Sequence, residues 1–418
     1  MKFQPYPRYK DSGIEWLGDV PEHWVISSLK YKIRLRYGDS LASEIREDGE
    51  VEVFGSNGPV GLHCVANTKA PAIVVGRKGS YGKIVWAENG GFVIDTAYSI
   101  DSDTTNLNLR WVYYELQPLG LDSLSQDTGV PGLARENAYG IRIAVPLFTE
   151  QTTIANFLDR ETLRIDALVE EKNHFIELLK EKRQALISHV VTKGLDPTVK
   201  MKESGVDWLG KVPEHWIMSY LKFVTYKIID TEHKTATFYE DGEYHVVRTS
   251  DVKNGRLIFT SAKYTNHEVY LEWTARGTPE AGDILFTREA PAGEACIVPT
   301  NSQICLGQRM VLFKVNHKKI LPMFLLYSLY GGLSDDFIRQ LSQGSTVIHL
   351  NMADIKNIPL FEIPIDEQQS IVRHLEQQTT KIDALLTETQ KSIALLTEHR
   401  TALISAAVTG KIDVREAA

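Results

Sequence analysis

The strongest constraint on the fold is that the sequence repeats itself. Lys10 to Lys30 reads KDSGIEWLGDVPEHWVISSLK, and Lys202 to Lys222 reads KESGVDWLGKVPEHWIMSYLK. A second matching pair of segments begins at Glu150 and at Glu367. The second pair shares Ile-Asp-Ala-Leu at 165–168 and 382–385, and Arg-x-Ala-Leu-Ile-Ser at 183–188 and 400–405. Two matches in the same order indicate a tandem duplication of a unit of roughly 200 residues.

The regions between the matching segments are unlike each other. From about Tyr31 to Val145, and from about Phe223 to Ile363, the two copies show almost no sequence that can be aligned. Constant flanks around divergent interiors predict one framework that presents two different surfaces. A duplicated fold whose interiors merely drifted apart is the alternative explanation.

The second pair of segments predicts two long helices. Apolar residues recur at heptad-like intervals with charges between them, which is typical of an amphipathic, coiled-coil-like helix. The first helix is expected from about Thr149 to Val191, before Gly194 and Pro197, and the second ends at Gly410. A helix of about 40 residues is about 60 Å long at ~1.5 Å per residue. The residues predicted to pair the helices are Leu158, Ile165, Leu168, Leu179, Leu375, Ile382, Leu385 and Leu396.

The divergent interiors are predicted to be mixed α/β domains with many tight turns. Short apolar strands are expected at 72–75, 83–86, 92–94, 283–286 and 296–298. The fold class is therefore α+β: two mixed α/β domains and two long antiparallel helices, in a tandem repeat with a pseudo-two-fold arrangement. The expected boundaries are 1–148 for the first domain, 149–200 for the first helix, 201–365 for the second domain and 366–418 for the second helix.

Composition places the chain among globular proteins: 43% of residues are hydrophobic and 24% are charged. No apolar run approaches the ~18 residues of a membrane span, and the N-terminus lacks a secretory signal. The three cysteines, Cys64, Cys296 and Cys305, show no metal-binding spacing. We therefore expect a cytoplasmic protein with reduced thiols. The net charge of −8 argues against a protein that coats DNA by itself, although partner subunits can supply phosphate contacts.

Two glycine-rich loops partly resemble cofactor-binding loops. Gly76 to Lys83 resembles a phosphate-binding loop, but its spacing is one residue too long and Ile84 replaces the Ser or Thr. Phe54 to Gly58 resembles the glycine turn of methyltransferases, but no Asn-Pro-Pro-Tyr follows to hold a target amine. Neither loop predicts a cofactor bound by this chain.

Charged residues and histidines also fail to form a catalytic centre. Glu170-Glu171-Lys172 has the local spacing of a nuclease motif, but it falls in a predicted helix where such carboxylates do not converge. His23 and His215 recur beside tryptophan in the constant boxes, and structural packing is the better account of both. The sequence therefore predicts a chain with no catalytic or metal site.

The ordered set of motifs resembles the specificity subunit of type I restriction–modification systems. The similarity rests on the paired Trp-Leu-Gly-x-x-Pro-x-His-Trp boxes at 16–24 and 208–216, on 282–289 (GDILFTRE) and 306–310 (LGQRM), and on the Arg-x-Ala-Leu-Ile-Ser helices. It covers essentially the whole chain. The resemblance implies that each domain reads one half of a split, asymmetric target in double-stranded DNA. It also implies that the helices set the spacer and dock two modification subunits, which use S-adenosylmethionine, and that restriction subunits, which use ATP and Mg, join the complex.

Base contacts vary within such a family, so the candidate DNA-binding residues rest on loop chemistry. They are Arg77, Lys78, Ser80 and Tyr81 in the first domain, and Arg248, Thr249, Arg288, Arg309 and Ser345 in the second. Two rivals to a DNA-reading subunit stay open. A fused restriction–methylation enzyme would need methyltransferase motifs within this chain, and a scaffold of duplicated modules on a coiled coil would bind no DNA.

Overall fold

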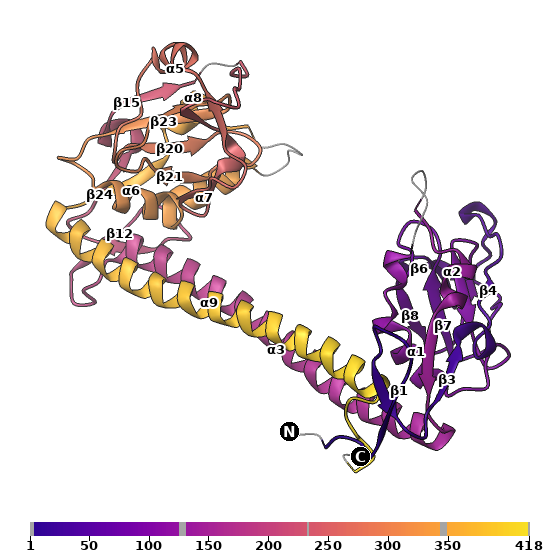
Figure 1. The fold of residues 1–418 in the computed structure, drawn as a ribbon. Coiled ribbons are helices and arrows are strands. Elements are labelled where there is room, and N and C mark those ends of the chain that lie inside the picture. The colour runs from indigo at the N-terminus through magenta and orange to yellow at the C-terminus, as the bar shows by residue number, and fades with distance from the viewer. Residues whose placement is uncertain (1–3, 125–130, 232–233, 343–348, 417–418) are drawn as a thin grey trace. The chain divides into compact units, whose positions relative to one another are not determined.

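The computed structural model describes residues 4–124, 131–231, 234–342 and 349–416 (Figure 1). Contacts divide the chain into two compact units: Met1–Asn173 with Gln390–Ala418, and His174–Thr389. These divisions fall inside the long helices rather than at their ends, because each unit contains one part of both helices. Within the described residues, no helix is both long and apolar enough to cross a membrane.

Among its described residues, the first unit contains eleven short strands, two short α-helices and parts of both long helices. The strands are β1 (Tyr9–Asp11), β2 (Asp19–Pro21), β3 (Val25–Ser28), β4 (Arg36–Tyr37), β5 (Val51–Gly55), β6 (Gly58–His63), β7 (Ala72–Gly76), β8 (Ile84–Ala87), β9 (Phe92–Val93), β10 (Ala97–Ile100) and β11 (Arg142–Val145). The helices are α1 (Leu109–Glu115), α2 (Arg135–Gly140) and the long α3 (Phe148–Lys193).

In the part of the second unit that the structure describes, thirteen strands and five short α-helices precede the second long helix. The strands are β12 (Met201–Glu203), β13 (Lys211–Pro213), β14 (Ile217–Tyr220), β15 (Thr225–Asp230), β16 (Tyr244–Val247), β17 (Val252–Lys253), β18 (Arg256–Leu257), β19 (Lys263–Thr265), β20 (Ile284–Thr287), β21 (Ala295–Ile297), β22 (Ile304–Leu306), β23 (Met310–Val315) and β24 (Pro359–Glu362). The helices are α4 (Leu221–Val224), α5 (His267–Thr274), α6 (Pro322–Leu329), α7 (Gly332–Ser342), α8 (Met352–Lys356) and the long α9 (Ile365–Val408).

The divergent interiors share one topology. The first unit has a four-stranded antiparallel sheet in the order β4-β10-β7-β8, and the second has β15-β23-β20-β21. Each also has a three-stranded sheet with one antiparallel and one parallel pairing, β6-β5-β9 in the first unit and β19-β16-β22 in the second. The predicted mixed α/β class and the predicted strands are confirmed. Although the two interior sequences have diverged, the arrangement of strands in these two sheets is the same in both units.

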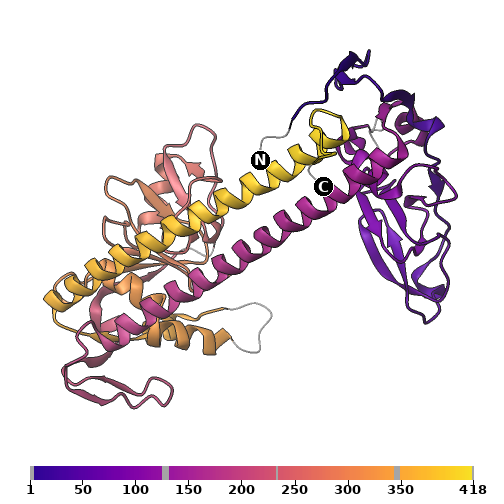
Figure 2. The ribbon, with the colours of Figure 1, turned by 90° about the horizontal axis from the view of Figure 1, so that it is seen from below.

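The long helices run antiparallel and are joined by one ion pair in each unit (Figure 2). In the first unit Arg400 donates to Asp166, with Nε to Oδ1 at 2.8 Å. In the second unit Arg183 donates to Asp383, with Nε to Oδ1 at 3.2 Å. Each bridge joins an Ile-Asp-Ala-Leu segment to an Arg-x-Ala-Leu-Ile-Ser segment, so the two constant motifs are partners across the helix pair.

Six of the eight predicted pairing residues are buried or half-buried, and two are not. Leu158, Ile165, Leu179, Leu375 and Ile382 are buried, and Leu396 is half-buried against the core of the first unit. Leu168 and Leu385 are instead 38% and 45% exposed. The structure places both outside the seam, because they lie three residues after the buried Ile165 and Ile382, whereas the half-buried Val169 and Leu386 lie four residues after them.

A glutamate near the start of each long helix fixes the constant box of its unit. Glu150 accepts a hydrogen bond from the Trp24 indole at 3.1 Å and contacts His23 Nε2 at 2.8 Å. Glu367 repeats the arrangement with Trp216 at 3.0 Å and His215 at 2.7 Å. An ionised carboxylate only accepts, so the imidazole donates through Nε2 in both units. The histidines are therefore packing residues, as the sequence suggested.

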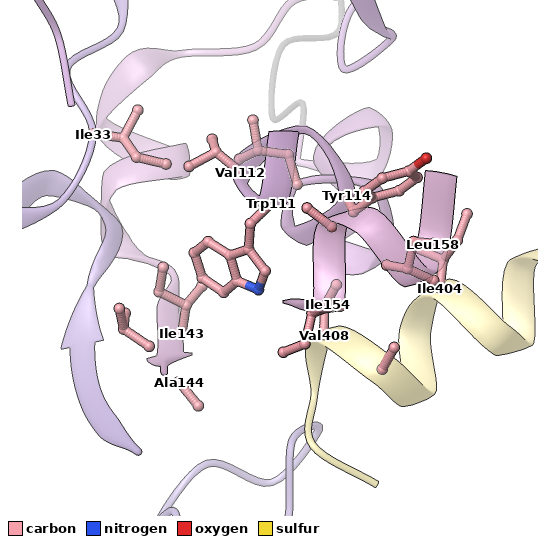
Figure 3. Packing of buried hydrophobic residues seen from close by; sticks show 14 of the residues in the cluster. Ile33, Trp111, Val112, Tyr114, Ile143, Ala144, Ile154, Leu158, Ile404 and Val408 are labelled. Carbon is pink, nitrogen blue, oxygen red and sulfur yellow. The ribbon is translucent and has the colours of Figure 1, made fainter. Parts of the chain in front are cut away.

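The core of the first unit joins its recognition domain to both helices. Figure 3 shows Trp111 of α1 beside Ile154 of α3 and Val408 of α9. All three side chains are at most 1% exposed and belong to one hydrophobic cluster. Full burial of such side chains contributes about 1.5–3 kcal/mol each, so the domain and the helices are stabilised as one body within this unit.

One carboxyl group in this core lacks a partner on one of its oxygens. Glu115, the last residue of α1, is 2% exposed, and its Oε2 has no hydrogen-bond partner among the described residues. The equivalent residue in the second unit is Ser328 of α6, whose hydroxyl donates to the Phe324 carbonyl at 2.9 Å. The equivalence follows from the preceding tyrosines, because Tyr114 and Tyr327 each contact a threonine of the long helix below them.

Replacing Glu115 with glutamine should stabilise the chain in a pH-dependent way. Burial raises the pKa of Glu115 well above its ordinary value. The group therefore stabilises the folded state most below about pH 4.3, and this contribution is lost as pH rises toward the folded pKa. We expect Glu115→Gln to raise the free energy of unfolding at pH 8 by on the order of 1–3 kcal/mol, and by less at pH 5.

The measurement is thermal or denaturant unfolding at both pH values. Glu136→Gln is the matched control, because the Glu136 side chain is 72% exposed. An equal effect of Glu115→Gln at pH 5 and pH 8 would show that the carboxyl group is not held protonated.

Candidate functional site

The candidate site in each unit is the hairpin that leaves the central strand of the four-stranded sheet. In the first unit residues 77–83 connect β7 to β8, and in the second residues 288–294 connect β20 to β21. The Gly76 amide donates to the Lys83 carbonyl at 2.8 Å, and the Thr287 amide donates to the Glu294 carbonyl at 2.8 Å. The hairpins therefore have the same length and the same closing hydrogen bonds.

Backbone contacts outside the hairpin make Arg77 and Arg288 equivalent. Arg77 N–H donates to Thr96, just before β10, at 2.8 Å, and Arg288 N–H donates to Arg309, just before β23, at 3.0 Å. The carbonyl of Arg77 accepts from Leu133 at 2.8 Å, and that of Arg288 accepts from Leu350 at 3.0 Å. Each predicted arginine thus occupies the same place in its own domain.

The hairpin of the first unit presents polar and cationic side chains. The Arg77 guanidinium lies 4.8 Å from the centroid of the Tyr37 ring and donates to the Asp95 carbonyl at 3.1 Å. Lys78 and Ser80 are exposed, whereas Tyr81 is half-buried against the core. Gly79 and Gly82 have positive φ angles of 73° and 76°, which glycine adopts without steric cost. Arg77, Lys78 and Ser80 are therefore accessible from outside, and Tyr81 has a packing role.

Two tyrosines and a second arginine surround Arg77. Tyr98 of β10 is 1% exposed, and its hydroxyl donates to the Leu133 carbonyl at 2.9 Å. Burial, together with the nearby Tyr37, raises the pKa of Tyr98 to about 12, so its hydroxyl stays protonated at neutral pH. The Arg135 guanidinium lies 5.0 Å from the Tyr37 centroid. Tyr37 and Arg135 belong to this cluster but were not among the predicted residues, because nothing in the sequence links β4, the hairpin and α2.

The hairpin of the second unit is bound into a charged network. Arg288 is 6% exposed and donates to Asp230 at 2.8 Å and to His349 Nε2 at 3.0 Å. Because arginine is always a donor, Nε2 accepts and the His349 proton lies on Nδ1, which contacts Glu289. Arg309 also contacts Glu289, with Nε to Oε2 at 3.1 Å. Arg288 is therefore enclosed by its own domain.

The remaining predicted residues of the second unit lie near this hairpin or outside the described residues. Arg248 donates to Asp251 and to the Ser261 carbonyl, the latter at 2.6 Å. Burial raises the pKa of Asp251, but hydrogen bonds from Arg248 outweigh it and leave the pKa below its usual value. Thr249 donates to the Ala290 carbonyl of the hairpin at 3.2 Å. Ser345 lies outside the residues that the structure describes.

Comparison with known proteins places these features in one family. The type I restriction modification DNA specificity domain matches residues 223–395. The specificity subunit of the type I restriction enzyme EcoBI from Escherichia coli is 23% identical over 357 residues, which are 82% of this chain and 74% of that protein. The MjaVIII specificity subunit from Methanocaldococcus jannaschii is 23% identical over 347 residues, 81% of this chain and 78% of that protein.

Solved structures share the fold. A chain described in work on complex assembly and conformational transition of the type I R-M system has a TM-score of 0.69 at 15% identity, covering 93% of this chain and 98% of that one. The HsdS subunit from Thermoanaerobacter tengcongensis has a TM-score of 0.50 at 15% identity, covering 94% of this chain and 98% of that one.

The fold and its paired hairpins define a duplicated chain that presents two different polar surfaces on one scaffold. Residues 223–395 match a type I restriction modification DNA specificity domain, and about four-fifths of the chain is similar to specificity subunits of type I restriction enzymes. The family resemblance seen in the sequence is confirmed, and the domain that matches is a DNA specificity domain.

The network around Arg288 should behave as a buried ion pair. We expect Arg288→Ala to lower the free energy of unfolding by roughly 2–5 kcal/mol, because Asp230 then loses a guanidinium partner where little water reaches. The double variant Arg288→Ala/Asp230→Ala should regain part of this loss. Denaturant unfolding of the two single variants and the double variant measures the coupling. Additive losses would show that the two side chains do not stabilise each other.

Proposed function

We propose that the chain reads a bipartite, asymmetric target in double-stranded DNA, one half with each recognition domain. The observation that carries the proposal is the pair of equivalent hairpins with unlike side chains. Arg77 lies against the aromatic ring of Tyr37, whereas Arg288 lies against a carboxylate. A shared scaffold with unlike side chains presents different hydrogen-bonding groups in the same geometry, which is what reading two different sequences requires.

The long helices are proposed to set the unread spacer between the two halves of the target. Each helix is continuous over more than forty residues and so contributes a stiff element to both units. The ion pairs of Asp166 with Arg400 and of Asp383 with Arg183 hold the helices in one register. A fixed register favours a fixed spacing of half-sites, as in other two-headed DNA readers.

Duplicated apolar side chains on the helices support the docking of two modification subunits. In the first unit Leu168 lies two residues after Asp166, and Leu395 lies five residues before Arg400. In the second unit Leu385 and Leu178 stand at the same positions relative to Asp383 and Arg183. All four leucines are between 38% and 56% exposed. Equal apolar surfaces in both copies suit two identical partners.

Cofactors and the remaining partners belong to the same proposal. S-adenosylmethionine is assigned to the modification subunits, ATP and Mg to the restriction subunits, and none of these to this chain. The complex acts on DNA in the cytoplasm. The net charge of −8 is compatible with this role because the modification subunits share the phosphate contacts.

Mapping of methylated adenines tests the proposed function. The chain is co-expressed with the modification subunit of its host, and host DNA is analysed by long-read sequencing. We expect a split motif with one methylated adenine on each strand. Exchange of residues 201–365 for those of another specificity subunit should change one half of the motif and leave the other half intact. A stable complex that leaves no split methylated motif would contradict the proposal. No salt-dependent DNA binding with partners present would favour the scaffold, and labelling of the chain alone by S-adenosylmethionine would favour the fused enzyme.

Charged substitutions of the exposed leucines test partner docking. Leu168→Asp with Leu395→Asp should reduce the modification subunits recovered in the complex from two to one, because the second unit keeps its own pair. Native mass spectrometry measures the stoichiometry. Leu163→Asp is the matched control, since Leu163 is 72% exposed and its counterpart in the second copy is Thr380. Retention of two subunits by the double variant would locate the docking surface elsewhere.

A further inference from the structure

We propose that Tyr37, Arg77 and Arg135 form a DNA contact in the first domain, with Arg77 reading a guanine edge, whereas the equivalent Arg288 is a positioning residue of the second domain. This inference rests on the proposed function. It divides two arginines that occupy the same place in the scaffold into one that reads DNA and one that holds the fold.

The two arginines differ because the edge strand of each four-stranded sheet carries a different residue at one equivalent position. Tyr37 of β4 pairs with Tyr98 of β10, and Asp230 of β15 pairs with Val311 of β23. Tyr98 and Val311 are each the second residue of the strand beside the hairpin strand. Tyr37 and Asp230 are therefore equivalent positions. The first domain places an aromatic ring where the second places a carboxylate.

That exchange changes the charge balance around the arginine. Asp230 and His349 occupy both terminal nitrogens of Arg288, and the Arg288 side chain is 8% exposed. Arg77 has no ion pair with any residue in the part of the chain that the structure describes. Its guanidinium donates a hydrogen bond to the Asp95 carbonyl and lies beside the neutral ring of Tyr98. The ion pair of Arg135 is with Glu136, at 3.6 Å, and the Glu136 side chain is 72% exposed.

The ring of Tyr37 holds a guanidinium without using its donors. Tyr37 is 42% exposed, and the guanidiniums of Arg77 and Arg135 lie 4.8 and 5.0 Å from its centroid. Stacking on an aromatic face leaves the N–H groups at the edge of the guanidinium available. Two neighbouring N–H groups match O6 and N7 of guanine in the major groove. Because the hairpin and the ring already orient the guanidinium, little side-chain freedom is lost when it binds.

The second cation favours DNA over a neutral ligand. Two guanidiniums beside one exposed ring raise the local positive potential, although the whole chain carries a net charge of −8. Arg135 contacts Tyr37 from the start of α2, and Arg77 from the hairpin, so two elements converge on one ring. Such local positive charge is what a phosphate-flanked base edge requires.

The test uses the full chain in complex with its modification subunit. DNA duplexes carry the mapped bipartite motif or a single base-pair change within either half, and equilibrium binding is measured by fluorescence anisotropy. We expect Arg77→Ala to weaken binding of the mapped motif by about tenfold or more and to abolish discrimination at one base pair of the first half. Discrimination in the second half should be unchanged.

Tyr37→Asp provides an independent variant, because it gives the first domain the carboxylate that the second domain has. It should keep Arg77 in place, neutralise it, and reproduce the loss at the same base pair while the melting temperature stays near that of the wild type. Lys30→Ala is the matched control. Lys30 lies 4.7 Å from the centroid of the exposed Tyr31 ring but in the constant flank, so its removal should leave base discrimination intact.

Arg288→Ala separates the two roles. We expect a lower melting temperature and no base pair at which discrimination alone is lost. If the Arg77→Ala complex bound every duplex with the affinity of the wild type, or lost the same factor in affinity on every duplex, the proposed base contact of Arg77 would be overturned. Loss of discrimination at one base pair by Arg288→Ala with an unchanged melting temperature would overturn its positioning role. Failure of the proposed function is a separate result, because the wild-type complex would then show no preference for any bipartite motif.

Discussion

The two glutamates at the starts of the long helices, Glu150 and Glu367, are the contacts on which the arrangement of each unit depends. Each accepts a tryptophan indole hydrogen bond and contacts the adjacent histidine, so the constant box has one orientation relative to its helix. Lys411 after α9 donates to the Leu17 and Asp19 carbonyls of the first box, and Lys193 of α3 makes the corresponding contacts with the second. Each box is thus tied both to the start of one long helix and to the end of the other.

A framework held in this way leaves the side chains of the recognition domains free to change. The hairpins after β7 and β20 are closed by amide and carbonyl groups, which are the same whatever side chains follow. Tyr37 and Asp230 therefore exchange an aromatic contact for an ion pair without altering strand order or register. The exchange changes which donors are available, since the carboxylate of Asp230 accepts a hydrogen bond from Arg288, whereas the ring of Tyr37 offers Arg77 no carboxylate. Whether an arginine at a given place in the fold has donors available for a ligand therefore depends on its neighbouring residues as well as on the arginine itself.

The sequence predicted the elements well and their contacts poorly. Repetition and apolar spacing located α3 and α9, and Gly194 and Gly410 marked their ends, both with positive φ. Short apolar runs located β7, β8, β9, β20 and β21. Repetition could not align the hairpins, because their equivalence lies in backbone hydrogen bonds that leave no side-chain pattern. Loop chemistry placed Arg77 and Arg288 in one class, although burial and Asp230 separate them. The ion pairs of Arg183 and Arg400 were missed because each spans some two hundred residues of sequence.

The same duplication reconciles a symmetric assembly with an asymmetric target. The leucines at 168, 395, 178 and 385 belong to segments that both copies retain, so a partner that docks there meets the same surface twice. The hairpins belong to segments that differ, so DNA meets two different surfaces. Separation of these two kinds of residue onto different elements means that a change in the recognised sequence need not disturb partner docking. Under the proposed function an acidic chain can still bind a nucleic acid, because local positive charge, such as that of Arg77 and Arg135 beside Tyr37, is what a contact with DNA requires.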